Sequence, residues 1–219
     1  GNGEPYGLIN LEASRRMGRT FEVQYPDPDV QGFNPCAEQS LANFETCCLA
    51  EIYLPNIEHY EELKKVARYL YRINKHSLAI KCAVKETEDI VHKNMRMGIG
   101  VTGYLQATEE QRSWLADCYD YLRSYDKEYS QLAGYPASIK LTTVKPSGTL
   151  SLLAGVTPGA HPGYSEYYIR RIRMSADSSL AHAAREHGYP VEFVLNFDGT
   201  EDKSTIVVSF PCKFPKGTM

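Results

Sequence analysis

Segments with the pattern of a β-strand alternate along this chain with segments that have the pattern of a helix. Residues 138–144, SIKLTTV, alternate like a strand and lead directly into the turn KPSGT, which opens a helix. A short helix within residues 178–189, closed by Gly188, then precedes two further strands, VEFVL and STIVVSF. Strands that alternate with helices predict an α/β architecture, here with a largely parallel sheet or a barrel.

Two longer helices are predicted in the middle of the chain. The first has Asn56 as its N-cap and runs to about residue 76, with apolar residues at spacings of three and four. The second begins after Thr108, which forms a capping box with Gln111, and ends at Gly134. Each helix has one apolar face, so both are expected to pack against a core.

Composition limits the class of protein. The 219 residues are 42% hydrophobic and 23% charged, which is typical of one globular domain with one core. The net charge of -3 favours neither a nucleic-acid nor a membrane surface, and no apolar run reaches the roughly 20 residues that span a bilayer. The first residues lack the features of a signal peptide, so the six cysteines are assigned to a reducing cytoplasm. The spacing of cysteines and histidines predicts no metal site.

Residues 1–54 are broken by Gly and Pro and are predicted to form loops around short strands, with one basic helical turn near residues 14–17. In an extended or tip-like loop the side chains of Asn34, Cys36 and Glu38 project to one face, so an amide, a thiol and a general base can converge on one substrate. A turn with a few buried cysteines is the alternative.

A second cysteine-rich segment follows. Cys47 and Cys48 lie one strand-length after Cys36, and Cys47 is placed to supply electrons by forming a disulfide with another thiol. The segment is therefore a candidate for redox chemistry.

Two glycine-containing motifs bear on nucleotide binding. Residues 98–103, GIGVTG, have the spelling of a dinucleotide-binding turn, but a basic helical pattern precedes them and no acidic residue follows at the required distance. A turn with closely packed glycines is preferred. The turn at Pro146, Ser147, Gly148 and Thr149 leads from a strand into a helix, so its free backbone N–H groups favour an anion such as phosphate. An ordinary capped turn is the alternative.

Several motifs, taken in order, resemble the catalytic barrel of a ribonucleotide reductase. They are NPCAEQSLAN, ETCCL with its first cysteine eleven positions after Cys36, RMGIGVTG, KPSGTLSLLAGVTPGAHP and YYIRRIR. They more closely resemble the adenosylcobalamin-dependent class II branch, the ribonucleoside-triphosphate reductase type. The resemblance covers essentially the whole chain and implies that residues 1–219 form roughly the second half of a ten-stranded α/β barrel. It places a finger loop near residues 34–38 and a phosphate-binding loop near residues 146–151.

The resemblance also implies roles for individual residues. Cys36 becomes the thiyl radical that removes the 3′-hydrogen of the ribose, Glu38 takes the proton of the 3′-hydroxyl, and Asn34 holds the sugar hydroxyls. Cys47 matches one member of the redox pair that reduces the 2′-carbon, and Cys48 departs from the family pattern. The residues that match the phosphate-binding loop are Ser147, Gly148, Thr149 and Leu150.

The cofactor and partners implied by the resemblance are adenosylcobalamin, a ribonucleoside tri- or diphosphate substrate, and a dithiol or thioredoxin-like reductant. The family's partner for Cys47, its C-terminal cysteine pair and its N-terminal effector segment have no counterpart in these residues. The chain is therefore expected to be an excised fragment or one piece of a split enzyme, completed by the missing barrel half. A catalytically incomplete nucleotide-binding piece and a generic thiol oxidoreductase are the alternatives.

Overall fold

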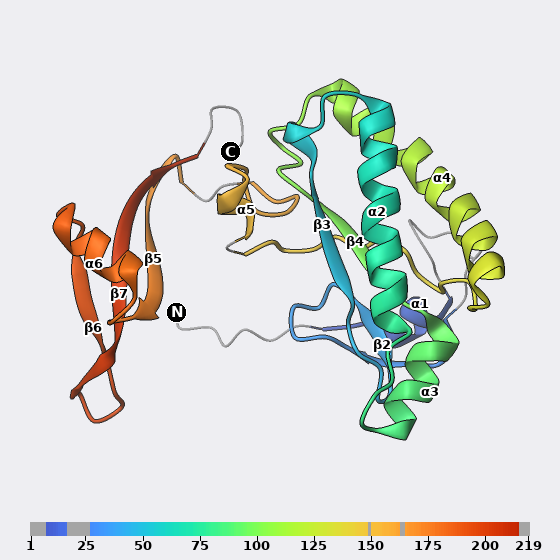
Figure 1. Cartoon of the computed structure of the whole chain (residues 1–219), viewed down its shortest axis with the longest axis horizontal. Coiled ribbons are helices and arrows are strands. Elements are labelled where there is room, and N and C mark those ends of the chain that lie inside the picture. Colours follow the sequence, from blue (N-terminus) through green and yellow to red (C-terminus); the bar gives the residue numbers. More distant parts are fainter. Residues whose placement is uncertain (1–7, 17–26, 149, 163–164, 215–219) are drawn as a thin grey trace. The chain divides into compact units, whose positions relative to one another are not determined.

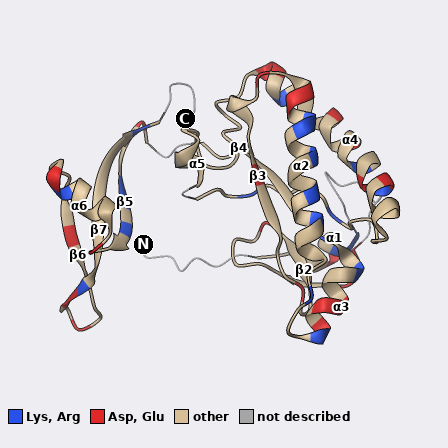
Figure 2. Ribbon diagram, viewed as in Figure 1, with Lys and Arg blue, Asp and Glu red and all other residues tan. Residues whose placement is uncertain are grey.

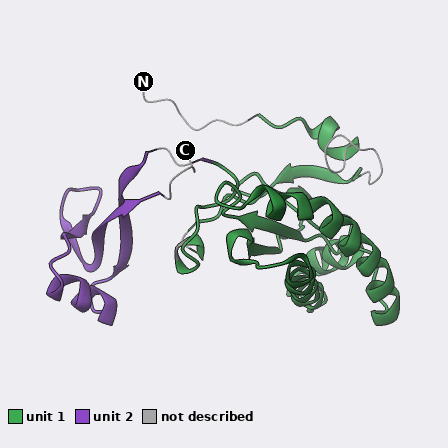
Figure 3. Ribbon diagram, turned by 90° about the horizontal axis from the view of Figure 1, so that it is seen from above, with its two compact units in different colours: residues 1–161 green, residues 162–219 purple. Residues whose placement is uncertain are grey.

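A computed structural model describes residues 8–16, 27–148, 150–162 and 165–214. It divides into two compact units, residues 1–161 and 162–219 (Figure 3). Composition predicted one core, but each unit has a hydrophobic core of its own. None of the helices in the described ranges is long and apolar enough to cross a membrane.

The sheet of the first unit is built on two parallel strands, β3 (Leu49–Tyr53) and β4 (Gly98–Thr102). Residues 139–143 continue it on the other edge of β4, where the N–H of Ile99 donates to the carbonyl of Leu141 at 2.9 Å. A single parallel bridge joins Ile99 to Thr142. The strand predicted at residues 138–144 is thus an extended segment beside β4 with one bridge.

Helical crossovers make these parallel pairings possible. The helices α2 (Tyr60–Leu78) and α3 (Lys85–Asn94) connect β3 to β4, and α4 (Glu109–Ala133) connects β4 to residues 139–143. Figure 1 shows α2 against the sheet, and α2 also packs on α4. The core between them includes Ile52, Leu54, Leu63, Ala67, Tyr71, Ile99, Cys118 and Leu122.

The helix ends test the capping predictions. The capping box of Thr108 and Gln111 is present at the start of α4, and Gly134 ends that helix with a φ of 72°. The N-cap predicted at Asn56 is wrong, because α2 begins after His59, whose ring nitrogen accepts from the N–H of Glu62. Asn56 ends a 3-10 turn, and its side-chain amide donates to the carbonyl of Ala154 at 3.2 Å.

A hairpin of two short antiparallel strands, β1 (Val30–Phe33) and β2 (Ser40–Ala42), precedes the sheet. The short helix α1 (Leu11–Arg16) is the predicted basic helical turn over its described residues, and Met17 lies outside them. The guanidinium of Arg15 donates to the carbonyl of Val30 at 2.8 Å, so α1 supports the base of the hairpin.

The second unit is a three-stranded antiparallel sheet in the order β5 (Tyr167–Ser175), β7 (Glu201–Lys213), β6 (Val191–Leu195). The helix α6 (Ser179–Glu186), followed by Gly188 with a φ of 72°, packs on it through the core of this unit. The predicted helix and both predicted strands are confirmed.

The expectation of a largely parallel sheet is wrong for the described residues. Among the named strands only β3 and β4 pair in parallel. A short loop of residues 196–200 joins β6 to β7, and a short connection of this kind produces an antiparallel hairpin.

Charged residues of both signs lie on α2, α3 and α4, and the acidic residues of α2 lie in its first turn (Figure 2). One pair of opposite charges is instead buried between α2 and α4. The ammonium of Lys75 lies 3.1 Å from Asp126 and also donates to the carbonyl of Pro136 and to the hydroxyl of Ser138. The Tyr71 hydroxyl donates to the same carboxylate at 2.7 Å. This cluster joins both helices to the loop that leads toward residue 139.

We predict that Lys75→Met lowers the free energy of unfolding by about 3–5 kcal/mol, because it leaves the Asp126 carboxylate buried without its cation. The urea-unfolding midpoint measures the effect. Lys64→Met is the control, because Lys64 pairs with the exposed Glu61, and an exposed pair contributes at most about 1 kcal/mol. Equal losses in the two variants would contradict the prediction.

Candidate active site

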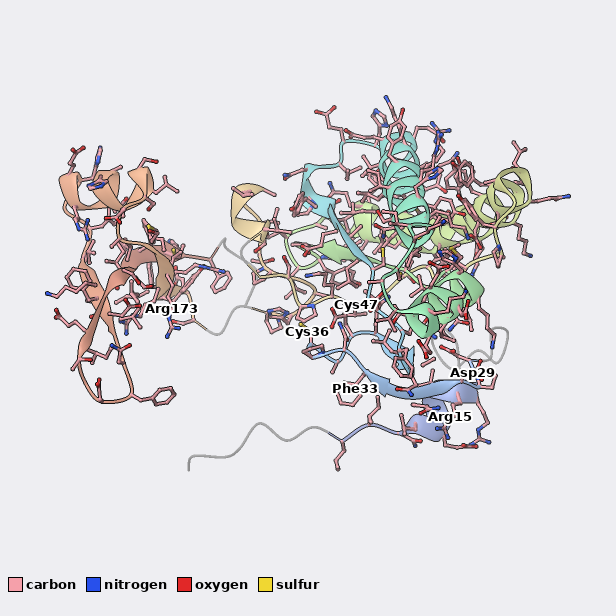
Figure 4. The ribbon with its side chains drawn as sticks, turned by 60° about the horizontal axis from the view of Figure 1, so that its bottom comes forward. Arg15, Asp29, Phe33, Cys36, Cys47 and Arg173 are labelled. Atoms are coloured by element: carbon pink, nitrogen blue, oxygen red, sulfur yellow. The ribbon has the colours of Figure 1, made fainter. Side chains whose placement is uncertain are left out.

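The turn of the β1–β2 hairpin carries the first candidate thiol. Two hydrogen bonds close the turn: the N–H of Asn34 donates to the carbonyl of Gln39 at 3.1 Å, and the N–H of Gln39 donates to Oδ1 of Asn34 at 3.0 Å. Cys36 is exposed at the tip, and Arg15 and Asp29 lie at the other end of the hairpin (Figure 4). The hairpin therefore presents Cys36 at its end.

The predicted arrangement of three side chains on one face is not the one observed. Ala37 has a φ of 60°, so the turn is not extended and the alternation of a strand does not apply. Asn34 is 4% exposed and uses its side-chain oxygen to close the turn, whereas Cys36 is exposed. Asn34 thus shapes the tip on which Cys36 lies.

The side chain of Glu38 makes no hydrogen bond with the described residues. Both of its carboxylate oxygens are buried, and neither has a hydrogen-bond partner among the described residues. Its carbonyl accepts a hydrogen bond from the hydroxyl of Thr143, which attaches the hairpin to the segment beside β4. An unpaired buried carboxylate is costly and is available to accept a proton or a hydrogen bond.

Glycines in β4 allow this close approach. A Cβ at Gly98 would lie only 2.7–2.9 Å from side-chain atoms of Thr143, Gln39 and Leu49. At Gly100 it would lie 3.0 Å from the Cβ of Lys145. The preference for a turn at GIGVTG was wrong, since residues 98–102 form β4, but the predicted close packing of its glycines is confirmed.

An ion pair crosses the sheet over Gly100. Glu51 of β3 lies opposite Gly100 and binds the ammonium of Lys145 at 2.8 Å. The Thr102 hydroxyl donates to the other Glu51 oxygen at 3.0 Å. Burial raises the pKa of Glu51, but the ion pair with Lys145 and the nearby hydroxyls of Ser147 and Thr102 outweigh burial and bring the pKa below its usual value. Glu51 is therefore a carboxylate at neutral pH.

Besides its ion pair with Glu51, Lys145 interacts electrostatically with residues of the hairpin tip. Its pKa is raised first by its hydrogen bond to Glu51, and the charges of Glu51, Glu38 and Cys36 add to this effect. The positive charge of Lys145 thus interacts with the candidate thiol and with the carboxylate of Glu38, although its ion pair is with Glu51. The sequence reasoning missed Glu51 and Lys145, although a carboxylate within the apolar strand LAEIY was a usable signal.

The second cysteine segment enters β3. Cys47 is exposed and Cys48 is half-buried, with the carbonyl of Cys48 accepting a hydrogen bond from the N–H of Gly98 at 2.8 Å. Burial, with a smaller contribution from Cys47, raises the pKa of Cys48 to about 11. Because Gly98 also contacts Gln39, both cysteine segments reach the same end of β4.

The predicted phosphate-binding loop follows Lys145. Ser147 is buried, Gly148 is exposed, and Leu150 begins the four-residue helix α5 (Leu150–Leu153). Thr149 lies outside the described residues. The Ser151 hydroxyl donates to the carbonyl of Gly148 at 2.8 Å and stabilises the start of the helix. The loop is thus next to the Glu51–Lys145 pair.

Within the described residues, no group of three or more His, Cys, Asp or Glu side chains is arranged to hold a metal ion. What the first unit brings together is a thiol at a hairpin tip, an unpaired carboxylate, a second exposed thiol and a loop that leads into a helix. This combination fits redox chemistry on an anionic substrate.

Several known proteins are similar to this chain in sequence or in fold. Residues 17–114 match the family model described as the ribonucleotide reductase barrel domain. Over these residues the chain is similar to the ribonucleotide reductase family.

Individual relatives extend the match along nearly the whole chain. A probable adenosylcobalamin-dependent ribonucleoside-triphosphate reductase of Dictyostelium discoideum is 37% identical over 99% of this chain and 29% of its own length. The adenosylcobalamin-dependent ribonucleoside-triphosphate reductase of Euglena gracilis is 40% identical over 87% of this chain and 27% of its own length. The crystal structure of a B12-dependent class II ribonucleotide reductase has a TM-score of 0.73 and 30% identity, covering 97% of this chain and 34% of that one. The chain thus spans about a third or less of the length of these proteins.

The Glu51 ion pair gives a prediction of pH dependence. A carboxylate whose pKa is lowered by folding stabilises the folded state above its usual pKa of about 4.5, and this stabilisation is lost as the pH falls through the folded-state pKa. We expect Glu51→Gln to be destabilising at pH 7 and the difference from the parent to shrink as the pH is lowered below 4.5.

Urea-unfolding midpoints across this pH range measure the difference. Glu128→Gln, at an exposed position of α4, controls for the loss of one negative charge. A difference between parent and Glu51→Gln that does not change with pH would contradict the role of the ionised carboxylate.

The two neighbouring thiols should differ in reactivity. A pKa raised from 9.0 to about 11 lowers the thiolate fraction of Cys48 about 100-fold near neutral pH. We expect iodoacetamide to alkylate Cys48 in a Cys47→Ser variant far more slowly than Cys47 in a Cys48→Ser variant. Mass spectrometry follows both rates, which should converge in concentrated urea. Equal rates in the folded proteins would show that burial does not protect Cys48.

Proposed function

We propose that the protein containing this chain reduces ribonucleotides to 2′-deoxyribonucleotides by a thiyl-radical mechanism and so supplies precursors for DNA. The observation that carries the proposal is the pairing of an exposed thiol, Cys36, with the buried and unpartnered carboxylate of Glu38 on one hairpin tip. The names of the relatives that match nearly the whole chain agree with this chemistry. We propose that the β1–β2 hairpin is the finger loop of a ten-stranded barrel.

The proposed reaction begins when the Cys36 sulfur radical removes the 3′-hydrogen atom of the ribose and becomes a thiol. Glu38 accepts the proton of the 3′-hydroxyl, and the 2′-hydroxyl takes up a proton and leaves as water. Cys47 and a second thiol supply two electrons and two protons and form a disulfide. Glu38 returns its proton to the 3′-oxygen, and Cys36 returns its hydrogen atom to the 3′-carbon and is a radical again.

The substrate phosphates are assigned to the loop after Lys145. Backbone N–H groups that precede a helix favour anions, and the proposed contacts are Ser147, Gly148, Thr149 and Leu150. Asn34 is proposed to reach the sugar hydroxyls from the hairpin turn. Because the relatives are named as triphosphate reductases, we infer that the substrate is a ribonucleoside triphosphate.

Adenosylcobalamin is the proposed cofactor, and when bound it supplies the unpaired electron that Cys36 carries. The exposure of Cys36 fits this role, since the thiol has to be reachable from outside the hairpin. A dithiol or thioredoxin-like protein is proposed to reduce the disulfide after each turnover. The reducing cytoplasm is the proposed location.

The remaining strands of the barrel are proposed to come from residues beyond this chain or from a separate polypeptide, because the relatives are at least about three times as long as the match. The same observation favours one alternative, in which this chain is a nucleotide-binding piece that another polypeptide makes catalytically complete.

We predict that the complete protein forms deoxynucleotides from ribonucleoside triphosphates and a dithiol only when adenosylcobalamin is present. Cys36→Ala and Glu38→Gln should each lower turnover by at least 100-fold, because each removes a group that takes part in the chemistry. Product formation followed by chromatography is the measurement. Cys82→Ala, which removes a half-buried thiol in the loop between α2 and α3, is the matched control and should retain activity.

The other outcomes separate the alternatives. Turnover without the cofactor would indicate a class with a separate radical-generating subunit. No turnover under any condition would favour the incomplete nucleotide-binding piece, and oxidation of a dithiol without nucleotide would indicate a generic thiol oxidoreductase.

A further inference from the structure

Three charged side chains that belong to different segments form a buried network at the base of the hairpin. Asp27 precedes β1, Glu45 follows β2, and Arg96 precedes β4. Their side chains are between 0 and 1% exposed. Burial at this level removes the water that would otherwise solvate the charges, so both carboxylates depend on the guanidinium of Arg96.

Arg96 binds both carboxylates. Its terminal nitrogens donate to both oxygens of Asp27, with Nη2 to Oδ1 at 2.9 Å, in the two-bond geometry that a guanidinium and a carboxylate favour. Its Nε lies 3.0 Å from Oε1 of Glu45. One guanidinium thus fixes the chain before the first hairpin strand and the chain after the second.

Both acidic residues make further contacts with other parts of the chain. Glu45 accepts from the amide of Asn94 at 2.9 Å and from the N–H of Ala42, the last residue of β2, at 2.7 Å. The N–H of Asp27 donates to the carbonyl of Arg15 in α1 at 2.7 Å. The network therefore extends from α1 through both ends of the hairpin to the residues just before β4.

Among the described residues, two contacts join the hairpin tip to the sheet. The Thr143 hydroxyl binds the carbonyl of Glu38, and the side chain of Gln39 packs on Gly98. The angle at which the hairpin leaves its base determines where its tip meets β4. Arg96 contacts the chain on both sides of the hairpin, at Asp27 and at Glu45.

We propose that Arg96 is a positioning residue for Cys36, acting through the two carboxylates that bracket the hairpin. The proposal rests on the proposed function, because the position of the hairpin matters only if Cys36 takes part in the reaction. A displacement of about 1 Å between reacting groups lowers a rate by about 100-fold, so loss of Arg96 should act on the chemical step.

The test compares Arg96→Met with Lys75→Met in the complete protein. Both variants remove a cation from a buried ion pair in the first unit, and both are expected to destabilise it. Only Arg96 contacts the chain on either side of the hairpin, since Lys75 binds Asp126 and the loop after α4. The Lys75 variant therefore measures what general destabilisation alone does.

The first measurement is hydrogen exchange of residues 30–45, followed by mass spectrometry. We expect Arg96→Met to lose protection in this segment, whereas Lys75→Met keeps it. The second measurement is turnover, for which we expect kcat to fall about 100-fold in Arg96→Met with KM for the nucleotide unchanged. Arg96→Lys, which keeps the charge but loses the two-bond geometry, should fall between Arg96→Met and the parent.

If Arg96→Met does not fold, the triple variant Asp27→Asn, Glu45→Gln, Arg96→Met removes all three charges, and we expect it to fold but still lose protection in residues 30–45. Equal loss of protection in the Arg96 and Lys75 variants, or normal kcat with an unprotected hairpin, would overturn the proposal. If the parent protein has no reductase activity, the proposed function fails. Unchanged protection of residues 30–45 in the Arg96 variants would separately overturn the proposal that Arg96 positions the hairpin.

Discussion

The close contact between the hairpin tip and the backbone of β4 is the constraint on which the candidate site depends. A side chain at Gly98 would occupy the space now filled by Thr143, Gln39 and Leu49. Without Gly98 and Gly100 the hairpin and Lys145 would be displaced outward from the sheet. One face of β4 thus has no side chains at these two positions and receives polar groups from elsewhere, whereas Ile99 of the same strand belongs to the apolar core.

Buried charge is used repeatedly to join distant segments of the first unit. The clusters around Arg96, around Glu51 and around Lys75 each combine residues from at least three segments of the chain. Burying such pairs stabilises a fold little by itself, but breaking one is costly. The clusters therefore act mainly to select one arrangement of hairpin, strands and helices over other compact arrangements with a similar apolar core.

Local signals in the sequence predicted the parts of the fold that local physics determines. The ends of α4, the helix α6 and the strands β6 and β7 were found because capping residues, glycines and alternation act within a few positions. β4 was mistaken for a turn because glycine suits both a turn and a strand that is approached closely. Glu51 and Lys145 were missed because they are 94 positions apart and meet only through the pairing of β3 with β4. The direction of strand pairing likewise depends on connections that alternation does not reveal.

The unpaired carboxylate of Glu38 changes the thermodynamics of binding at this site. A buried acceptor without a donor costs on the order of 1–3 kcal/mol, and more when it is charged. The folded chain already bears this cost, so a hydroxyl that binds there gains its hydrogen bond without first stripping water from the acceptor. Part of the affinity for any ligand that donates a hydrogen bond there is therefore stored in the fold as lost stability, and such a ligand should return that stability to the protein.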